Sequence, residues 1–133
     1  MTAPRILPPL DETNRPFWTG GQRRELLIQR CVACRRWVHP PVERCAGCGG
    51  ELVAEPVSGN GTVFTFTENF HQYNPEVPPP YVIAIVVLDE QDDLRLPTNI
   101  VDCSPEAVRI GMRVRARFEQ HGEVFVPVFA PAD

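Results

Sequence analysis

Two Cys-x-x-Cys pairs stand ten residues apart in the segment CVACRRWVHPPVERCAGC, residues 31–48, and the chain has only one further cysteine, Cys103. Zinc takes four ligands in a tetrahedron, with zinc–sulfur distances of about 2.3 Å. The two-residue spacing lets both sulfurs of a tight turn reach one ion, and two such turns joined by a short hairpin complete the set. We therefore predict a zinc site with the ligands Cys31, Cys34, Cys45 and Cys48.

The predicted zinc is structural, because four thiolates leave no coordination position open for a substrate or a water molecule. The alternatives are two disulfides or reactive thiols. The N-terminus MTAPRILPPLDE has no apolar core of the signal-peptide type, and no window of 18 apolar residues occurs. We therefore expect a cytoplasmic protein that does not cross a membrane, and a reducing compartment favours metal over disulfides. Cys103, at the end of an apolar strand, is interpreted as a small buried residue.

One feature of the cysteine segment departs from the usual pattern of a zinc knuckle, which favours glycine after its second cysteine. Gly49 follows Cys48 as expected, but Arg35 follows Cys34. If this turn requires a positive φ, Arg35 adopts it at a steric cost that glycine would not have.

Charge is distributed unevenly along the chain. Residues 1–54 carry eight arginines against five acids, whereas residues 55–133 carry five arginines against twelve acids. An acidic C-terminal part disfavours a broad contact with nucleic acid. Composition divides the chain into three segments, which we expect to be a helical lead-in at 1–27, a zinc ribbon at 28–54 and an OB-fold domain at 55–133.

The lead-in contains two candidate helices. Asp11 is placed to cap a short helix over ETNRPFW, which Pro16 keeps short or broken. GGQRRELLIQR is the second candidate, with Gly20 and Gly21 as the break before it and its Leu-Leu-Ile run as the apolar anchor.

The C-terminal part is predicted to consist of five strands. GTVFTFTENF is rich in β-branched and aromatic residues, and strict alternation puts Phe64 and Phe66 on one face and Val63 and Thr65 on the other. YVIAIVVLD is apolar throughout, so both of its faces are expected to be covered. In MRVRARFE, Met112 and alternate residues face inward, and the three arginines and Glu119 face outward. LRLPTNIVD and EVFVPVFA supply the other two strands, and CSPEAVRIG supplies one helical turn.

The predicted fold class is mainly β, with N-terminal helices, a zinc ribbon and a C-terminal five-stranded barrel. Five strands with a helical turn between the third and the fourth favour the OB-fold, although periodicity alone leaves another small barrel open.

Five motifs in order resemble the family once catalogued as domain of unknown function 35. They are FWTGGQRRELLIQRC, HPPVERCAGCGG, SGNGTVFTFT, PPYVIAIVVLDE and TNIVDCSPEAVRIGMRVRARFE, and the resemblance extends from about Asp11 to Ala130. It implies N-terminal helices, a rubredoxin-like zinc ribbon and an OB barrel. It further implies a non-catalytic accessory subunit that helps to bind CoA or an acyl-CoA. The chain departs from the family pattern at Arg35, and at Arg24, where a glycine often precedes the Glu-Leu pair.

By this resemblance the catalytic residues lie on a partner, either a thiolase-like retro-aldolase of steroid side-chain degradation or a thiolase, in an expected heterotetramer. A hot-dog-fold enoyl-CoA hydratase is the alternative partner. A nucleic-acid-binding module is a second, less favoured hypothesis, because OB barrels bind nucleic acid through aromatic platforms in a positive groove and this barrel is acidic. No catalytic residue is predicted in the chain itself.

The candidate ligand or partner contacts are drawn from two regions. The loop HQYNPEVPPP, at 71–80, lies between the first two barrel strands, where OB-folds bind ligands, although a rigid exposed loop is the simpler interpretation. Near the N-terminus, arginines suit CoA phosphates and aromatic side chains suit either an adenine ring or a partner interface; alternatively these aromatic residues only hold the helix to the protein. The predicted contacts are Phe17, Trp18, Arg23, Arg24, His71, Tyr73 and Tyr81.

Overall fold

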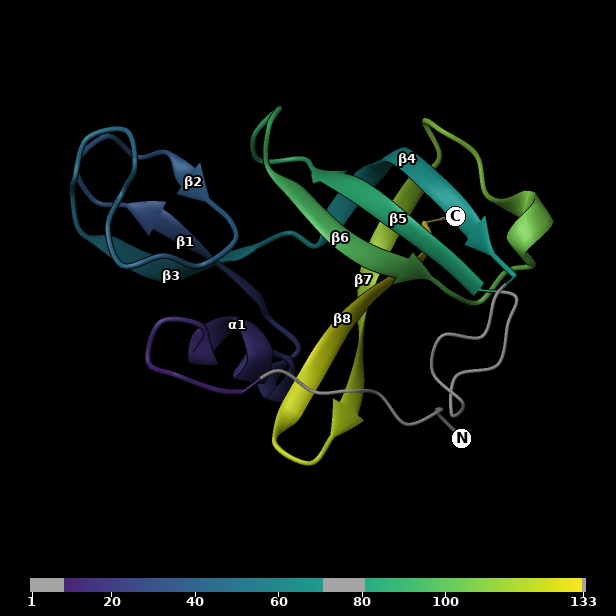
Figure 1. Ribbon diagram of the computed structural model, residues 1–133, viewed down its shortest axis with the longest axis horizontal. Coiled ribbons are helices and arrows are strands. Elements are labelled where there is room, and N and C mark those ends of the chain that lie inside the picture. Colours follow the sequence, from purple (N-terminus) through teal and green to yellow (C-terminus); the bar gives the residue numbers. More distant parts are fainter. Residues whose placement is uncertain (1–8, 71–80, 133) are drawn as a thin grey trace.

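The computed structural model describes residues 9–70 and 81–132, which form a short helical lead-in, a three-stranded sheet and a five-stranded barrel (Figure 1). The lead-in contains the α-helix α1, Arg15–Thr19, and the 3₁₀ helix η1, Gly20–Arg23. It packs against the last barrel strand and against the first strand of the sheet. Within the described part of the chain, no helix has the length and apolar character that crossing a membrane requires.

The prediction that Asp11 caps the helix was wrong, since the N-cap of α1 is Asn14 and Asp11 bonds within the turn that precedes it. Its carboxylate accepts a hydrogen bond from the backbone N–H of Asn14 at 2.8 Å, and the Asn14 side chain accepts one from the Asp11 N–H at 2.9 Å. This reciprocal pair closes the turn that leads into α1. Pro16 lies in the first turn of α1, where its missing N–H costs nothing.

The prediction of a second helix over GGQRRELLIQR was wrong beyond its first turn. η1 ends at Arg24, whose φ of 59° places it in the left-handed region, and Leu26–Cys31 form the strand β1. Leu26, Leu27 and Ile28 are all buried. Three consecutive buried residues are compatible with a strand that is covered on both faces, and this covering comes from segments distant in sequence.

The ribbon sheet has the strand order β2-β1-β3, with β2 at Trp37–Val38 and β3 at Leu52–Val57, both antiparallel to β1. The chain then passes through Ser58 and Gly59 into the barrel. Figure 1 shows the ribbon sheet to one side of the barrel, with this connection between them. Leu26, Ile28 and Trp37 of the ribbon belong to the same buried apolar cluster as the barrel core.

The barrel closes in the order β4-β5-β6-β8-β7, with β6 and β8 parallel and the other pairs antiparallel. This order, with a helical turn (η2, Pro105–Ala107) between the third and the fourth strand, is that of the OB-fold and confirms the predicted class. The strands are β4 at Asn60–Asn69, β5 at Tyr81–Leu88, β6 at Arg95–Ile100, β7 at Arg113–His121 and β8 at Val124–Pro131.

Alternate residues of the barrel strands fill a common core. On β5 the inward set of Val82, Ala84, Val86 and Leu88 is buried, as is Val114 on β7. The apolar sequence of β5 predicted that both of its faces are covered. For the outer face this is wrong among the described residues, since Ile83 is 41% exposed. On β7 the three arginines are exposed as predicted, but Glu119 is half-buried beside His121 rather than solvated.

A β-bulge in β4 overturns the predicted alternation of its aromatic residues. The register with β5 shifts between Val63 and Thr65, so that Val63 is buried and Phe64 is 47% exposed. Phe66, expected on the same face as Phe64, instead packs against the core. A bulge inserts one residue into a strand and thereby reverses the faces of the residues that follow.

The turn between β5 and β6 joins the ribbon to the barrel. The Gln91 side chain accepts a hydrogen bond from the Trp37 N–H and donates one to the Trp37 carbonyl, each at 3.0 Å. Asp93 pairs with Arg36 beside this contact. Gln91 therefore binds β2 as a strand residue would, and it sets the position of the ribbon relative to the barrel.

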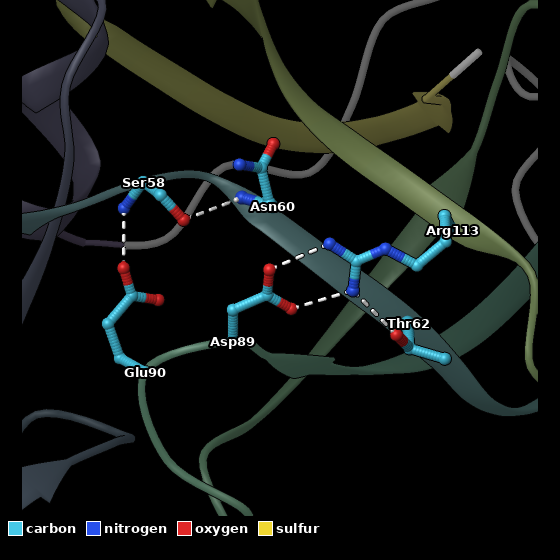
Figure 2. A network of polar contacts seen from close by, with 6 residues as sticks. All are labelled: Ser58, Asn60, Thr62, Asp89, Glu90 and Arg113. Carbon is cyan, nitrogen blue, oxygen red and sulfur yellow. Dashed lines mark hydrogen bonds and ion pairs between the residues drawn. The ribbon is translucent and has the colours of Figure 1, made fainter.

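A second polar network anchors the same turn to the barrel (Figure 2). Arg113 of β7 makes two hydrogen bonds to Asp89, at 2.7 and 2.8 Å, and a third to the Thr62 hydroxyl at 2.9 Å. Glu90 accepts a hydrogen bond from the Ser58 N–H at 2.7 Å, in the connection between ribbon and barrel. The hydrogen bonds from Arg113 lower the pKa of Asp89, so this carboxylate stays ionised.

Arg35 adopts a φ of 67°, and Gly49 at the matching position of the second knuckle has a φ of 75°. The left-handed conformation costs a residue with a Cβ roughly 1–2 kcal/mol, and glycine avoids this cost. We expect Arg35→Gly to raise the free energy of unfolding by about 1 kcal/mol, measured by urea denaturation of the zinc-loaded protein. Arg35→Ala is the control, because it removes the side chain but keeps the Cβ. A glycine variant no more stable than the alanine variant would contradict the interpretation.

Candidate metal centre and adjoining groove

The four predicted zinc ligands converge at one end of the ribbon. Cys31 ends β1 and Cys34 lies in the turn after it, while Cys45 and Cys48 form the second knuckle. All four sulfurs lie within 4.8 Å of one another, with Cys31 Sγ 3.4 Å from Cys48 Sγ and Cys34 Sγ 3.8 Å from Cys45 Sγ. Sulfurs of a zinc tetrahedron are separated by roughly 3.8 Å, and a disulfide needs about 2.05 Å. The cluster therefore fits zinc and not disulfides.

Backbone N–H groups of the knuckles point at the sulfurs and favour their thiolate forms. The Cys34 N–H lies 3.4 Å from Cys31 Sγ, and it is the main cause that lowers the pKa of Cys31 to about 6. The Cys48 N–H, followed by that of Gly47, lowers the pKa of Cys45. At Cys48 the Gly50 N–H also lowers the pKa, but the neighbouring thiols of Cys31 and Cys34 outweigh it and raise the pKa to about 11. A bound cation would stabilise the Cys48 thiolate as well, since zinc takes all four ligands as thiolates.

Gly50 makes room for the cluster. A Cβ at this position would lie 2.9 Å from Cys31 Sγ and 3.2 Å from Cys48 Sγ, closer than packed atoms normally approach. When bound, zinc cross-links the two knuckles, and it does so at a position where the sheet has little apolar core of its own.

Beside the ribbon lies a groove of about 990 Å³, bounded by α1, the segment after β2, and the barrel. Its walls are mainly apolar and aromatic. From the lead-in and the ribbon they include Phe17, Trp18, His39, Pro40 and Pro41, and from the barrel Phe64, Ile85, Arg95, Pro97 and Pro127.

Three rings form the wall between the lead-in and the ribbon. The Phe17 ring meets Trp18 edge to face at a centroid distance of 4.8 Å, and it meets His39 at 4.7 Å. Phe17 is only 6% exposed, so it fixes α1 to the ribbon, whereas Trp18 is half-buried and reaches the groove. Burial lowers the pKa of His39 to about 4, and its Nδ1 has no hydrogen-bond partner among the described residues. His39 is therefore neutral at pH 7.

The barrel wall is built around the bulge in β4. Phe64 projects from it, and the Arg95 guanidinium lies over its ring, 4.2 Å from the centroid. Next to this pair β6 and β8 separate, since their pairing is limited to Ile100 and Phe129. The Thr98 hydroxyl bridges the gap to the Pro127 carbonyl at 3.1 Å.

The structure brings together only some of the predicted contact residues. Trp18 lines the groove, and Phe17 lies directly behind it. Arg23 and Arg24 are exposed on the turn after α1, where Arg23 pairs with Glu25, and neither lines the groove. Tyr81 lies at the start of β5, opposite Asn69. The predicted contacts His71 and Tyr73 fall outside the described residues.

Phe64, Arg95 and His39 line the groove but are not among the contacts predicted from the sequence. Phe64 was read as one of two aromatic residues on a common face, because a bulge leaves no mark on a short alternating pattern. Arg95 lies 31 residues from Phe64 in sequence, so only the pairing of β4, β5 and β6 brings the two together.

Fold and site together define a protein that joins a four-cysteine zinc ribbon to an OB barrel. The models of the ChsH2 rubredoxin-like zinc ribbon domain and of the ChsH2 C-terminal OB-fold domain match residues 18–53 and 54–119. A DUF35 domain-containing scaffold protein of Methanocaldococcus jannaschii is 37% identical over 77% of this chain and 74% of its own length. The chain belongs to this DUF35 family, as its motifs predicted.

Two further relatives carry enzymatic names. A probable enoyl-CoA hydratase alpha subunit of Thermomonospora curvata is 37% identical over 97% of this chain, which spans 41% of that relative's length. A solved chain of the Ltp2-ChsH2(DUF35) aldolase superposes with a TM-score of 0.86 at 34% identity, covering 96% of this chain and all of the other.

We expect Cys45→Ser to lose zinc, because three thiolates and a serine hydroxyl make a poor zinc site. Zinc content measured by inductively coupled plasma mass spectrometry should fall from about one ion per chain to a small fraction of that. The ribbon signals in an NMR spectrum should collapse, while those of the barrel persist. Cys103→Ser is the matched control and should keep its zinc. A Cys45→Ser protein with a full complement of zinc and an ordered ribbon would contradict a four-thiolate site.

The depressed pKa of His39 predicts a loss of stability in mild acid. The unfolded chain binds the proton near the ordinary pKa of 6.5, but the folded chain binds it only near 4. The free energy of unfolding should therefore fall as the pH drops from 6.5 towards 4, by about 2 kcal/mol between pH 7 and pH 5.

Urea denaturation of the wild type and His39→Gln across this range isolates the effect, because acid weakens the zinc thiolates equally in both. The glutamine variant should show the shallower pH dependence. Parallel slopes for the wild type and His39→Gln would show that His39 is not the titrating group.

Proposed function

We propose that this chain is a non-catalytic accessory subunit of an acyl-CoA-processing complex. In this proposal it binds a thiolase-like aldolase subunit and helps to complete the acyl-CoA site at their boundary. The observation that carries the proposal is the full-length superposition on the ChsH2 chain of an aldolase, with a TM-score of 0.86 at 34% identity. A match of that extent includes the ribbon, the barrel and their relative placement.

Three titratable side chains of the described residues are engaged in contacts within the fold. His39 is held neutral against Phe17, and His121 lies beside the Glu119 carboxylate in a β-hairpin. Asp89 is engaged by Arg113.

Acyl-CoA is the proposed ligand of the complex as a whole. CoA carries phosphates that guanidinium groups bind well, and Arg23 and Arg24 are exposed on the turn that follows α1. Trp18 lies one turn earlier and presents part of its ring at the surface. These three residues are the candidates for a direct contact from this chain to the CoA moiety.

A hydratase partner is the second candidate, and the observation in its favour is the Thermomonospora relative named as a hydratase alpha subunit. The two alternatives differ in the fold of the partner, since an aldolase of this type resembles a thiolase and the hydratase expected from the resemblance has a hot-dog fold.

A nucleic-acid-binding role has less support, because Asp89, Glu90, Asp92 and Asp93 make the β5–β6 turn acidic.

Affinity purification of the tagged chain from its native host should recover a stoichiometric catalytic subunit, identified by mass spectrometry. We expect that subunit alone to process its acyl-CoA at least about tenfold more slowly than the complex, because an incomplete site positions the substrate poorly. Turnover by separated and recombined subunits measures this. A catalytic subunit with full activity on its own, or recovery of nucleic acid in place of a protein partner, would refute the proposal.

A further inference from the structure

Phe64, an aromatic residue of the groove, points away from the core, so its ring does not gain the hydrophobic stabilisation that burial would give. The bulge in β4 directs Phe64 away from the core, and the ring remains 47% exposed. Bulges that re-aim a side chain are over-represented at functional sites. On the neighbouring strand Ile83 is 41% exposed and Ile85 half-buried, so the apolar surface continues from the groove onto the outer face of β5.

The same wall carries a cation without an acidic partner in the described part of the chain. Arg95 stacks over Phe64 at 4.2 Å and makes no ion pair there. The acidic groups of the groove are already engaged, since Asp93 pairs with Arg36 and the Asp11 carboxylate accepts the Asn14 N–H. Stacking holds the guanidinium plane while leaving its N–H groups free to bind a carboxylate in the forked manner typical of arginine.

Backbone groups of β6 also face the groove. The Val101 N–H donates to the Phe129 carbonyl at 2.8 Å, so residues of odd number on β6 direct their backbone towards β8. Because β8 pairs with β6 only near Ile100, the N–H and carbonyl of Arg95 and the carbonyl of Pro97 point into the groove instead. An extended peptide can pair with such groups, whereas the hydrocarbon part of an acyl chain cannot.

We propose that this groove is the docking site for an extended segment of the catalytic partner subunit. The segment lies along β6, places apolar side chains against Phe64 and Ile85, and pairs an aspartate or glutamate with Arg95. This inference rests on the proposed function and adds the surface and the chemistry of the contact. Arg95 defines the charge of the segment, and the exposed aromatic and aliphatic residues define its apolar character.

The test uses the catalytic subunit that co-purifies with the wild-type chain. Arg95→Glu reverses the charge on the groove wall, and Phe64→Ala removes the exposed ring. Each should raise the Kd for that subunit at least tenfold in biolayer interferometry. Arg115→Glu is the matched control, because Arg115 is exposed on β7, makes no ion pair in the described part of the chain and does not line the groove. The Kd of the Arg115→Glu chain for the catalytic subunit should stay within twofold of the wild-type value. Zinc content and circular dichroism establish that each variant is folded.

A photo-crosslinking arm identifies the occupant. p-Benzoylphenylalanine at position 83 should crosslink to a partner peptide that contains an acidic residue, whereas the same probe in place of Ile110, which is exposed elsewhere on the barrel, should not. Unchanged affinity of both groove variants, or a crosslinked peptide without an acid, overturns the inference. The inference is also overturned if the isolated Arg95→Glu chain loses decanoyl-CoA binding but keeps its affinity for the partner. That result would make the groove a ligand site. If the wild type itself binds no catalytic subunit, the proposed function fails; if the wild type and the variants bind equally, only this inference fails.

Discussion

The four-thiolate cluster is the constraint on which the functional surface depends. The ribbon is a sheet of three strands. Its buried residues Leu26, Ile28 and Trp37 belong to the same apolar cluster as the barrel core, so the end of the ribbon that carries the knuckles is held by the cysteine cluster rather than by a core of its own. When bound, zinc joins its two knuckles, and the segment between them carries His39, Pro40 and Pro41, which form one wall of the groove. A bound metal is therefore expected to keep rigid the hairpin against which Phe17 packs.

The second constraint is the joint between ribbon and barrel. The connection through Ser58 and Gly59 alone would leave the two bodies free to rotate, but the β5–β6 turn holds β2 through Gln91 and Asp93. Asp89 and Arg113 tie that turn back to the barrel. The groove lies between the lead-in, the ribbon and the barrel, so its width is set by these polar contacts together with the packing of α1 on β8.

Most of the architecture followed from local patterns. The five barrel strands and the helical turn were predicted close to their observed positions, because each alternates or is flanked by turn residues in a way that short-range sequence reveals. The helix expected over residues 22–30 was wrong, since Leu26, Leu27 and Ile28 suit either a helix or a strand covered on both faces. Residues 26–31 form a strand because β2 and β3 supply the hydrogen bonds and Arg24 ends the preceding helical turn.

The sequence by itself determined the metal site, because ligand spacing is a local property: two cysteines on one tight turn reach the same ion whatever the remainder of the chain does. It also determined the barrel class, through five strands and one helical turn in the right order. Only the tertiary structure decided the groove. Phe64 and Arg95 meet because a bulge shifts the register of β4 and because β5 intervenes between their strands, and both are non-local events that leave no periodic trace.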